Sequence, residues 1–265
     1  MEPSRPQISV VLPAYNERES LPIVVARALE VLPRMVSDFE LIIVDDGSTD
    51  GTREACLDLL QSHHPTVRLV AHSQNRGYGA AIRSGFGHAR SDLVFYTDAD
   101  NQFDLADLEH FLPLIGEYDL IIGFRVYRYD TVIRSALSWA YNRLMRVMFR
   151  VRVRDVDCAF KLFRREVLNK IVIESDDFFV DAELVAKARK WNFRLLEKGV
   201  RHYPRVAGET TVRPSDIPRT LRRIALMWRR IYYPGRDRRE GPGGPGATVD
   251  IGVEVSPQGA QTAAR

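Results

Sequence analysis

Four short apolar runs recur in the first hundred residues, and most of them lead directly into polar residues. The runs are ISVVLPAY, FELIIVDD, VRLVAH and LVFYTD, and segments with the spacing of helices separate them. Near-continuous runs of Val, Ile and Leu between helices are typical of parallel strands that are covered on both faces. The sequence therefore predicts an α/β fold in which helices flank a mostly parallel sheet.

The second half of the chain is less regular. DLIIGFR and CAFKLF predict strands, while TVIRSALSWAYNRLMRVMF and VDAELVAKARKW predict helices. Residues 215–232 predict an amphipathic helix with Asp216 as its cap. After Pro234 the chain is rich in Gly and Pro, which predicts a disordered tail. We expect one folded domain over residues 1–213, a C-terminal amphipathic helix over 214–234 and the tail over 235–265.

Composition narrows the class of protein. The chain has 265 residues, of which 45% are hydrophobic and 28% charged, so it can bury a sizeable core. Its two cysteines lie far apart and lack the spacing of metal ligands, so the sequence indicates neither a disulfide framework nor a zinc site. The N-terminus lacks the apolar core of a signal peptide, and no run approaches the roughly 20 apolar residues of a membrane span. We expect a cytoplasmic protein that is soluble or peripheral on the cytoplasmic face of a membrane.

The net charge of +3 conceals two basic segments. Residues 124–154 contain eight arginines and one acidic residue, and residues 201–239 contain eleven arginines and three acidic residues. Such segments favour an anionic partner, which could be a nucleic acid, a phosphate group or an anionic membrane surface. A solvated basic face without a partner is the plain alternative.

Polar clusters follow three of the predicted strands, and parallel sheets bind ligands at this edge. In PAYNE, the ring of Tyr15 could stack on a nucleobase while Glu17 accepts hydrogen bonds from it. In TDADNQ, Asp100 and Gln102 lie two residues apart and could face the same way in an extended turn, with Asp98 behind them. Carboxylate and amide oxygens suit Mg²⁺ or Mn²⁺, which would neutralise a diphosphate leaving group. A strand end followed by a helix cap is the alternative.

Eight motifs in order along the chain resemble glycosyltransferase family 2. They are LPAYNE, IIVDDGSTDGT, TDADNQ, GFR, RSALSWAYN, DCAFKLFRREVL, AELVAKA and PRVAGET, and they cover about residues 8–213. Within the family, the chain is most similar to polyprenyl-phosphate sugar transferases of the dolichol-phosphate mannose synthase type. The resemblance implies the GT-A fold, with a Rossmann-like sheet. It also implies inverting, metal-dependent transfer of a hexose to a polyprenyl or dolichyl phosphate, with mannose from GDP-mannose or glucose from UDP-glucose.

The resemblance assigns the donor site residue by residue. The implied nucleotide-sugar contacts are Pro13, Tyr15, Glu17, Val44, Asp46, Asp98, Ala99, Asp100, Arg125 and Arg205. Among these, Arg125 and Arg205 would contact the donor diphosphate. Asp98, Asp100 and Arg125 are the predicted catalytic residues.

The resemblance also implies the metal and acceptor sites. Asp100 and Gln102 would bind Mg²⁺ or Mn²⁺. Arg134 and Ser138, one helical turn apart, would bind the acceptor phosphate. A phosphate acceptor is already ionised near neutral pH, so positioning and charge stabilisation matter more than a general base.

Two departures from the family pattern bear on the acceptor assignment more than on the donor site. Thr211 stands where the family has a lysine near the donor phosphates, and Arg213 is a candidate replacement. The string DCAF places Asp157 near the acceptor, where its carboxylate could act as a base toward a hydroxyl acceptor such as a glycan. A basic nucleic-acid-binding protein is the alternative from another class, but the chain has no recognisable nucleic-acid-binding module.

Apolar residues form one stripe along the predicted C-terminal helix. They are Ile217, Leu221, Ile224, Trp228 and Ile231, and arginines occupy the other positions. The stripe could pack on the domain or lie in the headgroup region of an anionic membrane. Trp139 and Trp191 are expected in the core.

Overall fold

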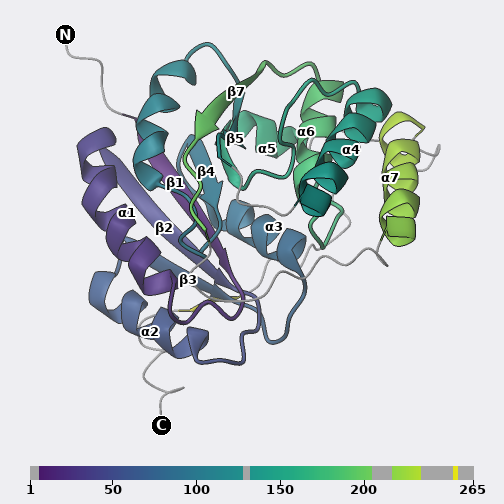
Figure 1. Ribbon diagram of the computed structural model, residues 1–265. Coiled ribbons are helices and arrows are strands. Elements are labelled where there is room, and N and C mark those ends of the chain that lie inside the picture. Colours follow the sequence, from purple (N-terminus) through teal and green to yellow (C-terminus); the bar gives the residue numbers. More distant parts are fainter. Residues whose placement is uncertain (1–5, 128–131, 205–216, 234–252, 256–265) are drawn as a thin grey trace.

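The structure is a computed structural model that describes residues 6–127, 132–204, 217–233 and 253–255 (Figure 1). Its strands form one sheet in the order β7-β5-β6-β4-β1-β2-β3-β8. They are β1 (Gln7–Ala14), β2 (Asp38–Asp45), β3 (Val67–Ala71), β4 (Leu93–Thr97), β5 (Leu120–Arg125), β6 (Phe160–Arg164), β7 (Leu195–Val200) and β8 (Val253–Val255). β1 pairs in parallel with β2 and β4, and β2 pairs in parallel with β3, as predicted from the apolar runs.

Helices cover both faces of this sheet. They are α1 (Leu21–Met35), α2 (Thr52–His63), α3 (Tyr78–His88), α4 (Val132–Phe149), α5 (Arg165–Lys170), α6 (Val180–Lys190) and α7 (Ile217–Tyr232), with the 3₁₀ helices η1 (Leu105–His110) and η2 (Leu112–Leu114). One hydrophobic core contains residues of α1, α2 and η1, and the other contains residues of α3, α4, α6 and α7. The predicted α/β class, with helices flanking a mostly parallel sheet, is confirmed.

The direction of the strands determines which loops meet. β6 is antiparallel to both β4 and β5, so β4 and β5 run the same way. The carboxyl ends of β1, β2, β4 and β5 therefore lie at one edge of the sheet, together with the beginning of β6. This edge brings together the polar clusters that follow the strands and the turn that precedes β6.

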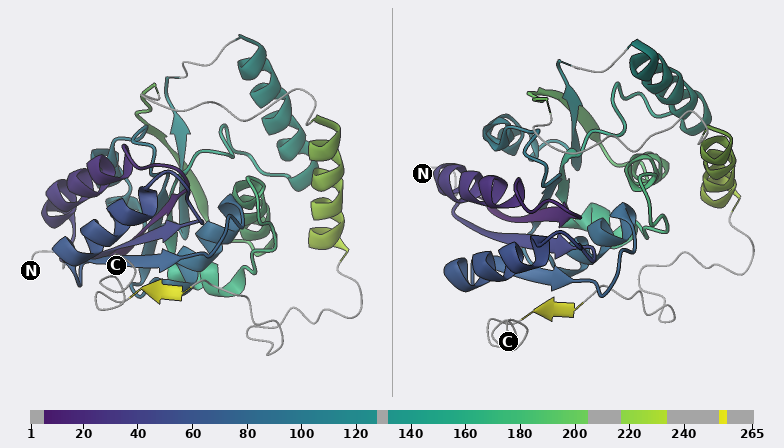
Figure 2. Two further views of the ribbon diagram at one scale, coloured as in Figure 1. Left: turned by 90° about the horizontal axis from the view of Figure 1, so that it is seen from below. Right: turned by 60° about the horizontal axis from the view of Figure 1, so that its bottom comes forward.

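Helix α7 lies beside α4 at one side of the molecule (Figures 1 and 2). Ile224 and Ile231 of the apolar stripe are buried, and Trp228 packs partly against the core, whereas Leu221 is 50% exposed. The hydroxyl of Tyr232 donates a hydrogen bond to the carbonyl oxygen of Phe149 in α4 at 3.2 Å. In the described part of α7, the stripe therefore packs mainly on the domain.

Two tryptophans differ from the prediction that they lie in the core. The side chain of Trp139 on α4 is 71% exposed, and that of Trp191 at the end of α6 is 42% exposed. Trp191 follows the basic run KARK, and a tryptophan can also lie on the surface of a helix, so residue type alone did not determine burial. Among the described helices, none has the length and apolar character needed to cross a membrane.

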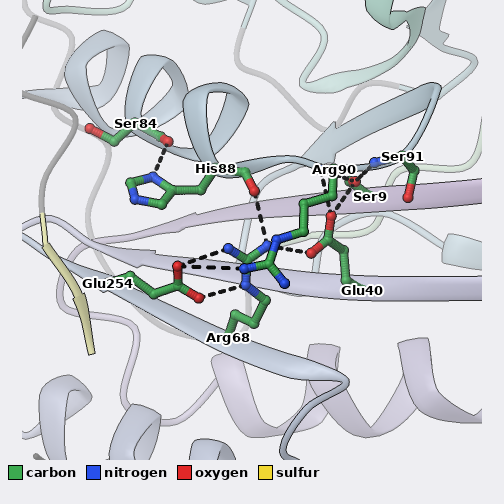
Figure 3. A network of polar contacts seen from close by, with 8 residues as sticks. All are labelled: Ser9, Glu40, Arg68, Ser84, His88, Arg90, Ser91 and Glu254. Atoms are coloured by element: carbon green, nitrogen blue, oxygen red, sulfur yellow. Dashed lines mark hydrogen bonds and ion pairs between the residues drawn. The ribbon is translucent and has the colours of Figure 1, made fainter. Parts of the chain in front are cut away.

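The strand β8 pairs antiparallel with β3 and forms one outer strand of the sheet. The guanidinium of Arg68 in β3 donates to both carboxylate oxygens of Glu254 at 2.7 and 2.9 Å (Figure 3). It also pairs with Glu40 and donates to the carbonyl oxygen of His88 at 2.9 Å. For residues 253–255 the prediction of a disordered tail is wrong, because a charge buried in β3 finds its partner there.

Candidate functional site

The acidic turn follows β4 at the carboxyl edge of the sheet. Asn101 has φ 59°, in the left-handed region that Asn tolerates better than most residues. The carboxylate of Asp100 accepts a hydrogen bond from the backbone N–H of Gln102 at 3.1 Å. The turn is therefore tight, and the predicted extended geometry is wrong. Asp100 and Gln102 still belong to the same turn and remain the predicted metal ligands.

A divalent cation fits the chemistry of this turn. The side-chain nitrogen of Gln102 donates to the carbonyl oxygen of Tyr203 at 3.0 Å, which leaves its amide oxygen for a ligand. In the part of the chain that the structure describes, no group of three or more His, Cys, Asp or Glu side chains could form a metal cage. Mg²⁺ does not require such a cage, because it binds through one or two carboxylates together with substrate phosphates. Asp100 and Gln102 would then share the cation with the donor diphosphate.

Asp98 accepts a hydrogen bond from the hydroxyl of Tyr78 at 2.7 Å. Burial raises the pKa of Asp98, while the Tyr78 hydrogen bond and the charges of Lys161 and Arg125 lower it. The charge of Glu17 also acts on Asp98, so the loop after β1 lies near the acidic turn. Sequence reasoning missed Tyr78, although a tyrosine at the start of a glycine-rich helix was a visible signal.

Arg125 ends β5 and forms a two-pronged ion pair with Asp155 in the turn before β6. Its Nε and one Nη donate to the two carboxylate oxygens at 2.7 and 2.8 Å. Burial alone would lower the pKa of Arg125, but the hydrogen bonds and charge of Asp155 raise it. This pair fixes the guanidinium while using two of its five N–H donors, so others can reach an anion.

Lys161 is a second cation beneath the acidic turn. Its ammonium is fully buried, donates to the carbonyl oxygen of Cys158 at 2.7 Å and to the hydroxyl of Tyr96 at 3.0 Å, and pairs with Asp181. Burial lowers the pKa of Lys161 to about 8, against the raising effect of the nearby acidic groups. A lysine inside the apolar strand CAFKLF was the sequence signal for such a buried pair.

Asp157 lies in the turn before β6, where the sequence placed it on the acceptor side. Burial and the charge of Asp155 raise the pKa of Asp157 to about 6, although Lys161, Arg125 and a hydrogen bond from Tyr141 act in the other direction. Its Oδ1 atom is buried and has no hydrogen-bond partner among the described residues. A carboxylate in this state could accept a proton near neutral pH.

Asp46 follows β2, and its side chain is buried in the protein. Its carboxylate accepts hydrogen bonds from the backbone N–H groups of Arg76 and Gly77 at 2.9 and 2.8 Å. Nδ1 of His72 lies 2.6 Å from Oδ1 of Asp46, and Nε2 of that ring lies 2.9 Å from the hydroxyl oxygen of Ser84. Asp46 thus shapes the loop that leads into α3, and its contact with the nucleotide stays a prediction.

The other predicted nucleotide contacts lie at or near the carboxyl ends of β1, β2 and β4. Pro13 and Val44 are partners in the β1–β2 register and are buried. Tyr15 is 45% exposed, and the carboxylate of Glu17 accepts a hydrogen bond from Ser20 at 2.5 Å. Ala99 is buried within the acidic turn. An exposed ring near a strand end is consistent with the predicted stacking on a base, which no contact here tests.

The predicted acceptor residues are described only in part. Ser138 lies on α4 and is half-buried. Arg134 lies on the same helix, but its side chain is outside the described residues, as are Arg205, Thr211 and Arg213.

An acidic turn and a fixed arginine lie at the carboxyl edge of a mostly parallel α/β sheet, which is the edge at which such sheets bind ligands. Residues 9–172 match Glycosyl transferase family 2, and the chain belongs to that family. The resemblance seen in the motifs is confirmed.

Three curated relatives match most of this chain. The dolichyl-phosphate beta-glucosyltransferase of Saccharomyces cerevisiae is 29% identical over 72% of this chain and 65% of its own. The glycosyltransferase AglD of Haloferax volcanii is 34% identical over 78% of this chain and 34% of its own. The undecaprenyl-phosphate 4-deoxy-4-formamido-L-arabinose transferase of an Enterobacter species is 31% identical over 77% of this chain and 62% of its own. The match thus spans from about a third to just under two thirds of each relative's length.

Solved structures share the fold. Glucosyl-3-phosphoglycerate synthase from Mycobacterium tuberculosis, in complex with Mn²⁺, UDP and phosphoglyceric acid, superposes with a TM-score of 0.65 at 19% identity, over 87% of this chain and 80% of that chain. The same enzyme has also been solved with Mg²⁺ and UDP, with a TM-score of 0.61 at 17% identity. At this identity the likeness establishes the fold alone.

Proposed function

We propose that this protein transfers a hexose from a nucleotide-sugar to a polyprenyl phosphate, with inversion at the anomeric carbon and with help from Mg²⁺ or Mn²⁺. The observation that carries the proposal is the acidic turn after β4, placed at the same sheet edge as the fixed Arg125. Two of the curated relatives are named for dolichyl-phosphate or undecaprenyl-phosphate sugar transfer, which supports a lipid phosphate as the acceptor.

The donor would lie over the carboxyl edge of the sheet. Tyr15 and Glu17 would contact the base, and Asp98 would line the sugar. Asp100 and Gln102 would hold the cation, which neutralises the charge of the departing diphosphate. Arg125, fixed by Asp155 and with further N–H donors, would contact the same diphosphate.

The reaction needs little proton transfer. An oxygen of the acceptor phosphate forms the new bond to the anomeric carbon, and the bond from that carbon to the donor diphosphate breaks, so that a nucleoside diphosphate leaves. The acceptor oxygen is already ionised near neutral pH. The protein therefore has to orient two anions and balance their charge, which suits the basic α4 and its predicted phosphate ligands Arg134 and Ser138.

The sugar is the finer part of the proposal. Both GDP-mannose and UDP-glucose fit the motifs, and the relative named as a glucosyltransferase favours UDP-glucose. The test is a transfer assay in which each donor is offered with a short-chain polyprenyl phosphate, with and without EDTA. We expect glycolipid from one donor, its loss with EDTA, and its recovery with added Mg²⁺ or Mn²⁺.

Two variants make this test specific. Asp100→Asn should abolish transfer, because it removes a carboxylate from the proposed cation site. Asp119→Asn is the matched control. Asp119 lies just before β5 and pairs with Arg194, at the end of the strands opposite the acidic turn. Equal activity of Asp100→Asn and the wild type would contradict the proposed role of the acidic turn.

A hydroxyl acceptor is the second candidate, and the state of Asp157 favours it. A buried carboxylate with a pKa of about 6, one of whose oxygens has no hydrogen-bond partner among the described residues, is suited to accept a proton. Asp157→Asn separates the candidates. Transfer to polyprenyl phosphate should survive this change, whereas transfer to a glycan hydroxyl should fall by about 100-fold or more if Asp157 is the base.

We also propose that the protein works peripherally on an anionic membrane surface at the cytoplasmic face. Trp139 and Val147 on α4 and Leu221 and Leu226 on α7 are exposed apolar side chains. Arg229 and Arg230 on α7 are exposed as well. Such a surface suits the headgroup region of a bilayer, where a lipid-linked phosphate is found.

A further inference from the structure

Asn142 lies in the middle of α4 and is only 7% exposed. Its Oδ1 accepts a hydrogen bond from the backbone N–H of Val156 at 3.0 Å. Its Nδ2 donates to the carbonyl oxygen of Ser138 at 2.9 Å and lies 3.4 Å from the hydroxyl oxygen of the same residue. One buried amide therefore joins the helix that carries Ser138 to the turn before β6.

That turn, residues 155–158, is held by side chains from three different elements. Arg125 of β5 holds the carboxylate of Asp155, Asn142 of α4 holds the N–H of Val156, and Lys161 of β6 holds the carbonyl oxygen of Cys158. Each contact reaches a different residue of the turn. A shift of α4 would therefore be transmitted to the turn that fixes Arg125.

Packing alone does not explain an asparagine at this position. Asn is a poor residue for a helix interior, because its side chain competes for backbone hydrogen bonds. Neighbouring positions of α4 that face the same core carry Met145 and Phe149. A leucine would avoid burying an amide, but it would leave the buried backbone N–H of Val156 without its acceptor. What the amide adds is a fixed distance between Ser138 and the turn.

We propose that Asn142 is a positioning residue for the acceptor. It sets α4, and with it the hydroxyl of Ser138, at a fixed place relative to the turn that fixes Arg125. The acceptor phosphate then meets the donor diphosphate in the geometry that transfer requires. Asn142 acts through Ser138 and Val156 and does not touch the reacting atoms. This inference rests on the proposed function, because it takes Ser138 as an acceptor ligand.

The test compares Asn142→Ala, Asn142→Leu and Met145→Ala in steady-state transfer to a short-chain polyprenyl phosphate. Asn142→Leu keeps the number and branching of the side-chain heavy atoms and leaves no cavity, so it remains informative if the alanine variant does not fold. Met145→Ala removes buried apolar volume from the same helix and serves as the matched control. Both Asn142 variants should raise the KM for the acceptor by about tenfold, as expected for lost hydrogen bonds, with the KM for the donor within about twofold of the wild type.

Met145→Ala should lower the melting temperature and leave the ratio of the two KM values unchanged. An unchanged acceptor KM in a folded Asn142→Leu protein would overturn the positioning role. So would an equal rise in both KM values, because that pattern indicates a general loss of structure.

A binding measurement separates this inference from the proposed function. Calorimetry with dodecyl phosphate reports phosphate binding without any transfer. If the wild type binds dodecyl phosphate and Asn142→Leu binds it about tenfold more weakly, the inference stands even when no glycolipid forms. If glycolipid forms and binding is the same in both proteins, the inference falls and the proposed function stands. If the wild type neither binds nor transfers, both are wrong.

Discussion

The hydroxyl of Tyr78, the first residue of α3, donates a hydrogen bond to the carboxylate of Asp98 at 2.7 Å. The ring of Tyr78 stacks on the ring of Phe178, with centroids 5.3 Å apart. This stacking also restrains the position of the hydroxyl. This contact joins α3 to the end of β4. It gives Asp98 a fixed orientation beside the acidic turn in which the predicted metal ligands lie.

Tyr78→Phe should therefore lower kcat/KM for the transfer by about 10- to 100-fold, the value of one hydrogen bond to a charged group. The phenylalanine keeps the stacking on Phe178, so any loss of stability should be limited to that of the one hydrogen bond. Tyr118→Phe, in the loop before β5 at the opposite edge of the sheet, is the control. A Tyr78→Phe enzyme with the kinetics of the wild type would show that Asp98 needs no such partner.

Asp157 should make stability depend on pH in the direction opposite to that of most carboxylates. Its pKa is about 6 in the folded protein, above the ordinary value of 3.8, so the folded state binds the proton more tightly than the unfolded state. The cost of ionising Asp157 is therefore absent below about pH 4, grows between pH 4 and pH 6, and is complete above pH 6. Two pKa units correspond to no more than about 3 kcal/mol.

Asp157→Asn should accordingly stabilise the protein at pH 8 and change its stability much less at pH 4.5. Urea unfolding of both proteins at the two pH values measures the difference. An equal effect of the substitution at both pH values would mean that Asp157 has an ordinary pKa.

Arg68 and Glu254 should contribute unequally to the closed edge of the sheet. The side chain of Arg68 is 6% exposed and that of Glu254 is 37% exposed. Arg68→Met leaves Glu40, whose side chain is only 12% exposed, without its cation, so the free energy of unfolding should fall by about 3 kcal/mol or more. Glu254→Gln removes only the outer partner and should cost less than about 1 kcal/mol. Urea denaturation ranks the two variants, and the reverse order would contradict this account of β8.

Exposed arginines on α7 should bind anionic vesicles. The wild type should sediment with vesicles of phosphatidylserine and phosphatidylcholine. The Arg229→Glu, Arg230→Glu double variant should stay in the supernatant. Arg27→Glu with Arg34→Glu changes the net charge equally on α1, across the sheet, and should leave binding intact. If both double variants are released to the same extent, net charge and not this surface determines binding.

The sequence predicted the sheet and the acidic turn because both depend on local pattern. Strands showed as apolar runs, and Asp98 and Asp100 followed one of them directly. The pairs that complete the site join distant residues, such as Tyr78 with Asp98 and Lys161 with Asp181, and no local pattern specifies them. The extended turn was wrong because Asn101 takes a left-handed conformation, which several polar residues tolerate.

The C-terminal strand could not be predicted for a similar reason. Residues 253–255 are short and follow a segment rich in Gly and Pro, so nothing local distinguishes them from a flexible tail. Their place is set by the edge of β3 and by Arg68, which is 186 residues away from Glu254 along the chain. The fold shows that Arg68 is buried beside Glu40 and can bind a second carboxylate. The sequence alone does not show that Arg68 is buried.

The most direct measurement compares polyprenyl phosphate with the corresponding polyprenol as acceptors, using the purified protein, Mg²⁺ and the donor that the assay selects. Mass spectrometry of the lipid product reports the new bond. We predict a hexosyl phosphate lipid from the phosphate, its loss in Asp100→Asn, and no product from the alcohol. Product from the alcohol or a glycan hydroxyl, but none from the phosphate, would contradict the proposed acceptor and identify Asp157 as the residue to test next.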